Sequence, residues 1–124
     1  MDKRQNNYCY LSKEGIIFII HEGEQTAVVI NQVGKAVTEI IQKVKSSGKP
    51  ILILSDITKV GKGNLGARRA GLDLFKNLEY QKLAIVGVNF LNQRLVKAVV
   101  TASGVGFKIK LFNTESEAKK WLKS

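Results

Sequence analysis

Two residue types that commonly build catalytic or metal sites are almost missing from this chain. Cys9 is the single cysteine and His21 the single histidine among 124 residues. One cysteine cannot form an intramolecular disulfide, and it cannot supply a zinc site made of several cysteines. The scattered carboxylates show no spacing that would bring several of them to one cation. We therefore expect no metal, no cofactor and no catalytic residue, with Cys9 as a structural residue of its strand.

Long apolar runs are also lacking. The longest, such as residues 16–20 and 51–54, are far shorter than the roughly 20 residues that cross a bilayer. The opening stretch MDKRQNNYCY has basic residues but no apolar core, unlike a secretory signal. These two absences lead us to expect a cytoplasmic protein that is not transmembrane.

Acidic residues are scarce relative to basic ones. The chain has 20 Lys and Arg against 10 Asp and Glu, a net charge of +10. An excess of this size attracts nucleic acid, anionic lipid or an acidic protein, and charge alone does not choose among them. Aromatic residues make up only 7% of the chain and show no stacking motif, so nucleic acid is the least favoured of the three.

The first half of the chain reads as a β-hairpin followed by a helix. The stretches NYCYLS and IIFIIH have the composition of two strands, joined by a turn at Gly15. Apolar residues then recur every three or four positions over residues 27–45, which is the period of a helix, with Thr26 as its N-cap. Gly48 and Pro50 end this helix.

The second half alternates strands and helices. Apolar runs at residues 50–57, 83–88 and 109–112 lack alternation, which indicates strands covered on both faces, and helices are expected between them at 64–78 and about 91–103. Thr114 and Glu117 form a capping box for a last helix, whose Trp121 we expect to be buried against the sheet. The order ββαβαβαβα predicts one α/β domain, residues 1–124, with an N-terminal β-hairpin and parallel strands after it.

The stretch GKGNLG, residues 61–66, spells the G-x-G-x-x-G pattern of dinucleotide-binding loops. However, three residues separate it from the preceding apolar run, and no acidic residue ends the next strand to hold a ribose. A P-loop is excluded because no Lys-Ser or Lys-Thr pair follows the glycines. Two interpretations remain: a sharp loop that brings the next helix close to the sheet, or a cradle of backbone N–H groups and basic side chains for an anion.

A few isolated polar residues near the strand ends could in principle act as catalytic groups. His21 and Glu22 could act together as a base, but adjacent strand residues point to opposite faces, which argues against this pairing. Asp56 closes a buried strand at the edge where α/β sheets bind ligands. It is equally suited to cap the following loop by accepting backbone hydrogen bonds.

Four stretches taken together resemble a known superfamily. The runs ILILSDITKV, ARRAGLDLF, KLAIVGV and KLFNTESEAKKWL are similar to the STAS superfamily, in particular to small SpoIIAA-like proteins of bacteria. The most specific part of the similarity consists of Phe112, Thr114, Glu117, Ala118, Trp121 and Leu122, with Ala67 and Arg68 in support. The resemblance implies a STAS/SpoIIAA-like fold and a non-enzymatic regulator of the anti-sigma factor antagonist type, which binds other proteins. It also implies a tendency to form homodimers.

This chain differs from the superfamily pattern at one position. The resemblance implies that STAS antagonists switch partners when a Ser or Thr is phosphorylated at the start of the helix that follows the strand at residues 50–57 here, because the phosphate adds charge beside the partner. In this chain the corresponding positions carry Asn64 and Leu65, neither of which accepts a phosphate in that manner. The nearest hydroxyl belongs to Thr58, several residues earlier, which is the remaining candidate phospho-acceptor.

These observations lead to three functional hypotheses. The first is a regulatory domain that binds an unknown protein partner through a basic surface, called here the basic junction. Its predicted members are Lys59, Lys62, Gly63, Asn64, Arg68 and Arg69. The second is binding or sensing of a small anionic or amphiphilic, lipid-like ligand at the same place, since the superfamily is linked by fold to lipid-carrying Sec14-like proteins. The third and weakest is nucleic-acid binding through net charge. An apolar pocket beside residues 61–69 would favour the second hypothesis.

Overall fold

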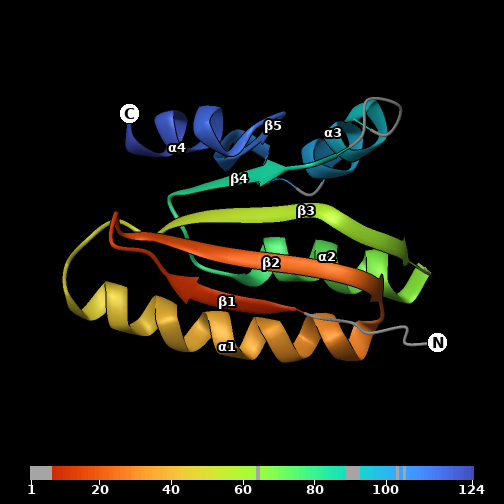
Figure 1. Ribbon diagram of the computed structural model, residues 1–124, viewed down its shortest axis with the longest axis horizontal. Coiled ribbons are helices and arrows are strands. Elements are labelled where there is room, and N and C mark those ends of the chain that lie inside the picture. Colours follow the sequence, from red (N-terminus) through yellow and green to blue (C-terminus); the bar gives the residue numbers. More distant parts are fainter. Residues whose placement is uncertain (1–6, 64, 89–92, 103, 105) are drawn as a thin grey trace.

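The computed structural model describes residues 7–63, 65–88, 93–102, 104 and 106–124. Within these residues, five strands form one sheet in the order β1-β2-β3-β4-β5 (Figure 1). The strands span Tyr8–Leu11 (β1), Ile16–Gln25 (β2), Leu52–Gly63 (β3), Lys82–Val86 (β4) and Ile109–Phe112 (β5). β1 is antiparallel to β2, and each later strand is parallel to the one before it. The predicted order of strands and helices is therefore confirmed.

Helices cover both faces of the sheet. They span Ala27–Ser46 (α1), Leu65–Asn77 (α2), Gln93–Ala102 (α3) and Glu115–Lys123 (α4), and a short 3-10 helix at Gly106–Lys108 (η1) precedes β5. Residues of α1, α2 and α3 pack on one face, and those of α4 pack on the other. Figure 1 shows α1 along β1 and β2, with α4 beside β4 at the opposite end of the sheet.

The continuous apolar run of β2 results from burial on both faces. Ile17 and Ile19 point toward α1, while Ile16 and Phe18 belong to the cluster that includes Leu122 of α4. All four strand residues are at most 3% exposed. A strand covered on both sides has no solvent face, which is why polar residues do not alternate with apolar ones here.

Both predicted helix caps are present. The Thr26 hydroxyl accepts a hydrogen bond from Val29 N at 3.2 Å, and the Thr114 hydroxyl accepts one from Glu117 N at 3.2 Å. Each bond satisfies an N–H group that the first turn of a helix leaves without a partner. Gly15, in the turn between β1 and β2, has a φ of 82°, as its predicted role requires.

The last helix is tied to the first hairpin. Glu14, in the β1–β2 turn, pairs with Lys119 at 3.1 Å and also with Lys123. The Lys119 ammonium lies 5.6 Å from the centre of the Phe18 ring, a cation–π arrangement that extends the cover of α4 over β2. Elements from opposite ends of the sequence thus share one face of the sheet.

Trp121 packs against the core cluster of its sheet face, but it is less buried than expected. Its side chain is half-buried, whereas Leu122, at 2% exposed, forms the core of that helix face. The Trp121 ring lies 5.6 Å from the Phe112 ring, and the Lys82 ammonium is 5.2 Å from its centre. Because a polar head group lies against the indole, this part of α4 borders the core instead of filling it.

The expected loop after residue 57 is wrong. β3 continues to Gly63 and pairs with the second half of β2, where Lys59 faces Glu22 and Gly63 faces Gln25. Register shifts interrupt this pairing, as in β-bulges. A Cβ at Gly61 would lie at an ordinary contact distance of 3.4 Å from the carbonyl carbon of Gly23, so the approach of the two strands does not require glycine at this position. Gly61 and Gly63 are therefore strand residues, and Gly66 lies within α2.

Candidate partner-binding site at the end of β3

Lys59 presents its charge on the extension of β3. Its Nζ is 3.8 Å from Oε2 of Glu22 on β2, and 77% of the lysine side chain is exposed. An ion pair this open contributes about 0–1 kcal/mol to stability. The pair therefore holds Lys59 only weakly, and the ammonium group is accessible to another molecule.

Arg68 and Arg69 lie near the start of α2, directly after the extended strand. Both are exposed, and no ion pair or side-chain hydrogen bond joins either guanidinium to another described residue. Positive side chains near a helix N-terminus oppose the helix dipole, and the first turn of α2 contains no acidic residue to offset them. Helix stability therefore does not explain these two arginines, whereas contact with an acidic partner would.

The other members of the basic junction are described only in part. Gly63 is the last residue of β3, and the backbone of Lys62 belongs to the same strand. Asn64 and the side chain of Lys62 lie outside the described residues. The sequence-predicted residues thus fall on one strand end and the helix that follows it, with Ala67, 3% exposed, fixing that helix against the protein interior.

Thr58 lies just beyond the part of β3 that pairs with β4. Its backbone N–H donates a hydrogen bond to Oδ1 of Asp56 at 2.9 Å, so Asp56 has the capping role that was one of its two predicted alternatives. Gly87, just after β4, has a φ of 97°, and a Cβ there would come 2.4 Å from the Thr58 hydroxyl oxygen. Thr58 itself is exposed. Its hydroxyl oxygen faces Gly87 beside the end of β4 and does not lie at the start of α2.

The single histidine is buried in a hydrogen-bonded cluster. His21 is 6% exposed; burial lowers its pKa, while a hydrogen bond with Gln25 and the charge of Asp56 act in the opposite direction. Gln25 is itself held by Asn7, with Asn7 Nδ2 donating to Gln25 Oε1 at 2.7 Å. Burial likewise raises the pKa of the Cys9 thiol, with the charge of Glu39 as a smaller cause. These arrangements favour structural roles for both residues.

Two hollows of about 270 Å³ lie away from the basic junction. One is between α3 and β5, lined by Lys97, Val100, Thr101, Gly106, Ile109, Lys110 and Leu111. The other is between the start of β1 and α1, lined by Asn7, Tyr8, Val29, Gln32, Val33 and Ala36. Neither includes a member of the basic junction, which gives the ligand hypothesis no support at that place. No group of three or more His, Cys, Asp or Glu able to hold a metal occurs in the part of the chain that the structure describes.

Sequence reasoning overlooked a second basic region. Between Glu79 and Glu115 the chain has no Asp or Glu, although it carries five basic residues there: Lys82, Arg94, Lys97, Lys108 and Lys110. The sequence signal for this region is the absence of Asp and Glu over a long stretch. The sequence does not show that part of this stretch forms an edge strand, which follows only from the sheet order.

Among the described residues, every helix is too short or too polar to cross a bilayer.

Comparison with known proteins agrees with the observed fold. A family model described as SpoIIAA-like matches residues 16–123. A comparison with curated protein sequences gives no match.

Two solved structures have the same fold. One is an uncharacterised protein with a SpoIIAA-like fold from Shewanella loihica, 21% identical, with 95% of this chain and 93% of that chain covered and a TM-score of 0.62. The other is an anti-sigma factor antagonist from Mycobacterium paratuberculosis, 14% identical, with 100% and 98% covered and a TM-score of 0.63. The resemblance to the STAS superfamily is confirmed, and the family match over most of the sequence shows that the chain belongs to the SpoIIAA-like family.

Proposed function

We propose that the whole chain, residues 1–124, is a non-catalytic cytoplasmic STAS-like domain that regulates by binding another protein through the basic junction. The observation that carries this proposal is the exposure of Arg68 and Arg69 without a partner among the described residues. A STAS-like fold carries many unrelated activities in principle, so the argument rests on this surface and not on the fold. The fold of an anti-sigma factor antagonist, shared with this chain, is consistent with it.

The chemistry of the surface selects an acidic partner. A guanidinium group binds a carboxylate through two parallel hydrogen bonds, which gives both energy and orientation. Lys59 adds a mobile positive charge on the neighbouring strand. The net charge of +10 increases the rate at which an acidic protein encounters this surface.

Regulation by phosphate requires a different position from that of the usual antagonists, because residues 64 and 65 are Asn and Leu. We propose Thr58 as the acceptor, since the residue is exposed and directly precedes Lys59. A phosphate there adds roughly −1.5 to −2 charges at neutral pH. It would compete with an acidic partner for the same basic side chains and thereby weaken the complex.

The test is charge reversal with a matched control. The protein and its Arg68→Glu/Arg69→Glu variant are used to capture partners from the host's own extract, and bound proteins are identified by mass spectrometry. The control is Lys35→Glu/Lys43→Glu, which changes the net charge equally on exposed positions of α1. Lys45 is unsuitable because it pairs with Glu79 at 3.2 Å.

A specific partner should be lost with the arginine variant and retained with the control. Equal loss from both variants would show that only the overall charge of the protein attracts it. Native mass spectrometry of the protein from its host separates the other hypotheses: a bound small anion or lipid, or co-purifying nucleic acid, would contradict the proposal.

A further inference from the structure

The outer edge of β5 is an unpaired strand edge. β5 is the last strand in the sheet order, and its pairing partner is β4 through the register Leu83 to Ile109 and Val86 to Phe112. No described residue pairs with its other side. In a parallel ladder, alternate residues direct their backbone N–H and C=O groups to each side. The outward groups of β5 are therefore available to another strand.

The hollow between α3 and β5 opens on this edge. Three consecutive strand residues line it: Ile109, Lys110 and Leu111. Successive side chains on a strand point to opposite faces, so a hollow on one face would touch only alternate residues. Contact with all three indicates that the hollow reaches the backbone of β5, and no residue of β4 is among those that line it. On its other side the hollow is lined by Val100 of α3, which gives it an apolar wall beside the strand.

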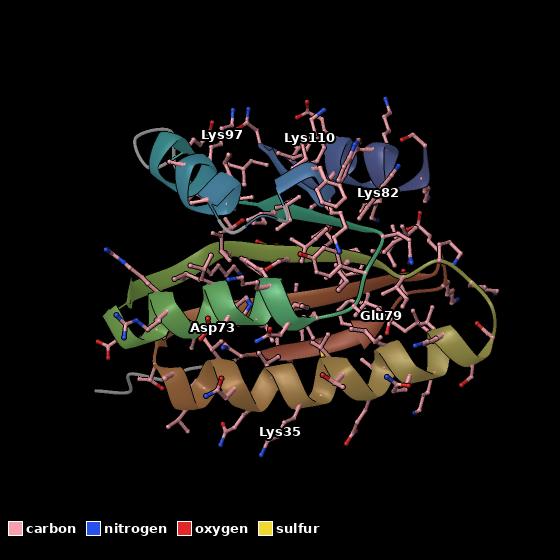
Figure 2. All side chains as sticks on the ribbon, turned by 180° about the vertical axis from the view of Figure 1, so that it is seen from behind. Lys35, Asp73, Glu79, Lys82, Lys97 and Lys110 are labelled. Atoms are coloured by element: carbon pink, nitrogen blue, oxygen red, sulfur yellow. The ribbon has the colours of Figure 1, made fainter. Side chains whose placement is uncertain are left out.

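Lysines gather around the edge. Lys97 and Lys110 line the hollow, and Figure 2 shows both at the end of the molecule formed by α3 and β5, remote from Lys35 on α1. The Lys108 ammonium lies 4.7 Å from the centre of the Tyr80 ring, and that of Lys110 lies 5.5 Å from the Phe112 ring. Aromatic rings hold these cations without neutralising them. A bound segment therefore meets positive charge, since residues 80–114 include no Asp or Glu.

We propose that the β5 edge binds an extended acidic segment of a partner protein, which adds to the sheet as a further strand. Backbone hydrogen bonds to β5 supply the pairing, acidic side chains on the face of Phe112 meet Lys110, and the apolar side chains that alternate with them face the hollow, where Lys97 adds positive charge. A second copy of this chain is a poor occupant, since pairing β5 with itself would place lysines of like charge opposite one another. The proposal concerns a surface separate from the basic junction and holds independently of the function proposed for that junction.

The probe is a fluorescent peptide long enough to cover β5, in which Glu alternates with Val. Its affinity for the full chain is measured by fluorescence anisotropy, and amide shifts in NMR spectra report where it binds. Two further peptides carry N-methyl groups on one or the other set of alternate backbone nitrogens. Because only one set of N–H groups faces β5, one methylated peptide should bind like the parent and the other should not.

The protein variants separate the edge from general charge. Lys97→Glu/Lys110→Glu should weaken binding about tenfold more than Lys35→Glu/Lys43→Glu, since each reversal beside the edge turns attraction for the peptide's carboxylates into repulsion. Arg68→Glu/Arg69→Glu should weaken it no more than the α1 control, which distinguishes this edge from the basic junction. Circular dichroism confirms that each variant is folded, and Lys110→Gln replaces Lys110→Glu if the latter is not.

Several results would overturn the proposal. These are absence of parent-peptide binding, equal binding of both methylated peptides, an equal effect of the β5-edge and α1 variants, or shifts that exclude residues 109–112. Any of these results would indicate that the lysines near β5 only prevent unwanted pairing of this edge strand with other chains.

Discussion

Replacement of Gly87 by alanine tests how tightly the ends of β3 and β4 fit together. Gly87 has a φ of 97°, a conformation that residues with a Cβ rarely adopt. A Cβ there would lie 2.4 Å from Thr58 Oγ1, 2.5 Å from Thr58 N and 2.6 Å from Thr58 Cα. Two of these atoms belong to the backbone, so rotation of the threonine side chain cannot relieve the overlap.

The expected cost has two separable parts. A positive φ costs alanine about 1–2 kcal/mol, and the overpacked contact adds about 1–3 kcal/mol. Gly15→Ala provides the control, because Gly15 has a φ of 82° but no atom within 4 Å of its added Cβ. The control should lose about 1–2 kcal/mol, and Gly87→Ala about 2–5 kcal/mol.

Urea unfolding followed by circular dichroism measures both changes in free energy. The difference between the two variants isolates the contact with Thr58, since the conformational cost is common to both. A difference below about 0.5 kcal/mol is within the usual additivity error and would refute a tight fit between Gly87 and the strand end. It would also remove the reason for treating Thr58 as fixed at this place.

Two buried polar residues, Ser55 and His21, give predictions about stability. Ser55 is 0% exposed and its hydroxyl has no partner among the described residues, so Ser55→Ala should stabilise the protein by about 1 kcal/mol in urea unfolding; a loss of stability would indicate a partner for that hydroxyl. Burial lowers the pKa of His21 from its ordinary 6.5, so the folded state binds fewer protons than the unfolded chain just below that pH. Stability from neutral His21 is fully present above about pH 6.5 and declines as the pH falls toward the lower folded-state pKa. His21→Gln should flatten this part of the stability–pH curve, and an unchanged slope would contradict the assignment.

Elements bounded by local signals could be predicted from the sequence. The starts of α1 and α4 depend on Thr26 and Thr114, each of which bonds to a residue three positions later. Because such contacts join residues that are close in the sequence, a local sequence pattern is enough to predict them. The position of the β1–β2 turn at Gly15 was predictable for the same reason.

The length of β3 could not be predicted in this way. Its extension to Gly63 depends on pairing with Gly23 and its neighbours, far away in the sequence, across two register shifts. The three residues after the apolar run, residues 58–60, lack a strand pattern. The sequence therefore predicts that the strand ends at Ile57. The same limit applied to Trp121, whose exposure depends on where Lys82 and Phe112 lie.

The candidate site was predictable in composition but not in geometry. Charge alone identified Lys59, Arg68 and Arg69. That Lys59 has an acidic neighbour, whereas the arginines lack one among the described residues, follows only from the packing of β2 and α2. The basic edge at β5 was hidden for a related reason, since no local pattern states which strand lies outermost.

The sequential strand order also affects how the chain folds during synthesis. Each strand pairs with the strand made immediately before it, so pairing can proceed as the chain leaves the ribosome, with no early strand waiting for a late one. α4 is the exception, because it must return to the face that includes Phe18 and to the Glu14 turn. Until α4 has left the ribosome, one apolar face of the sheet remains without its cover. Completion of the fold, and protection of the nascent protein against aggregation, therefore depends on α4.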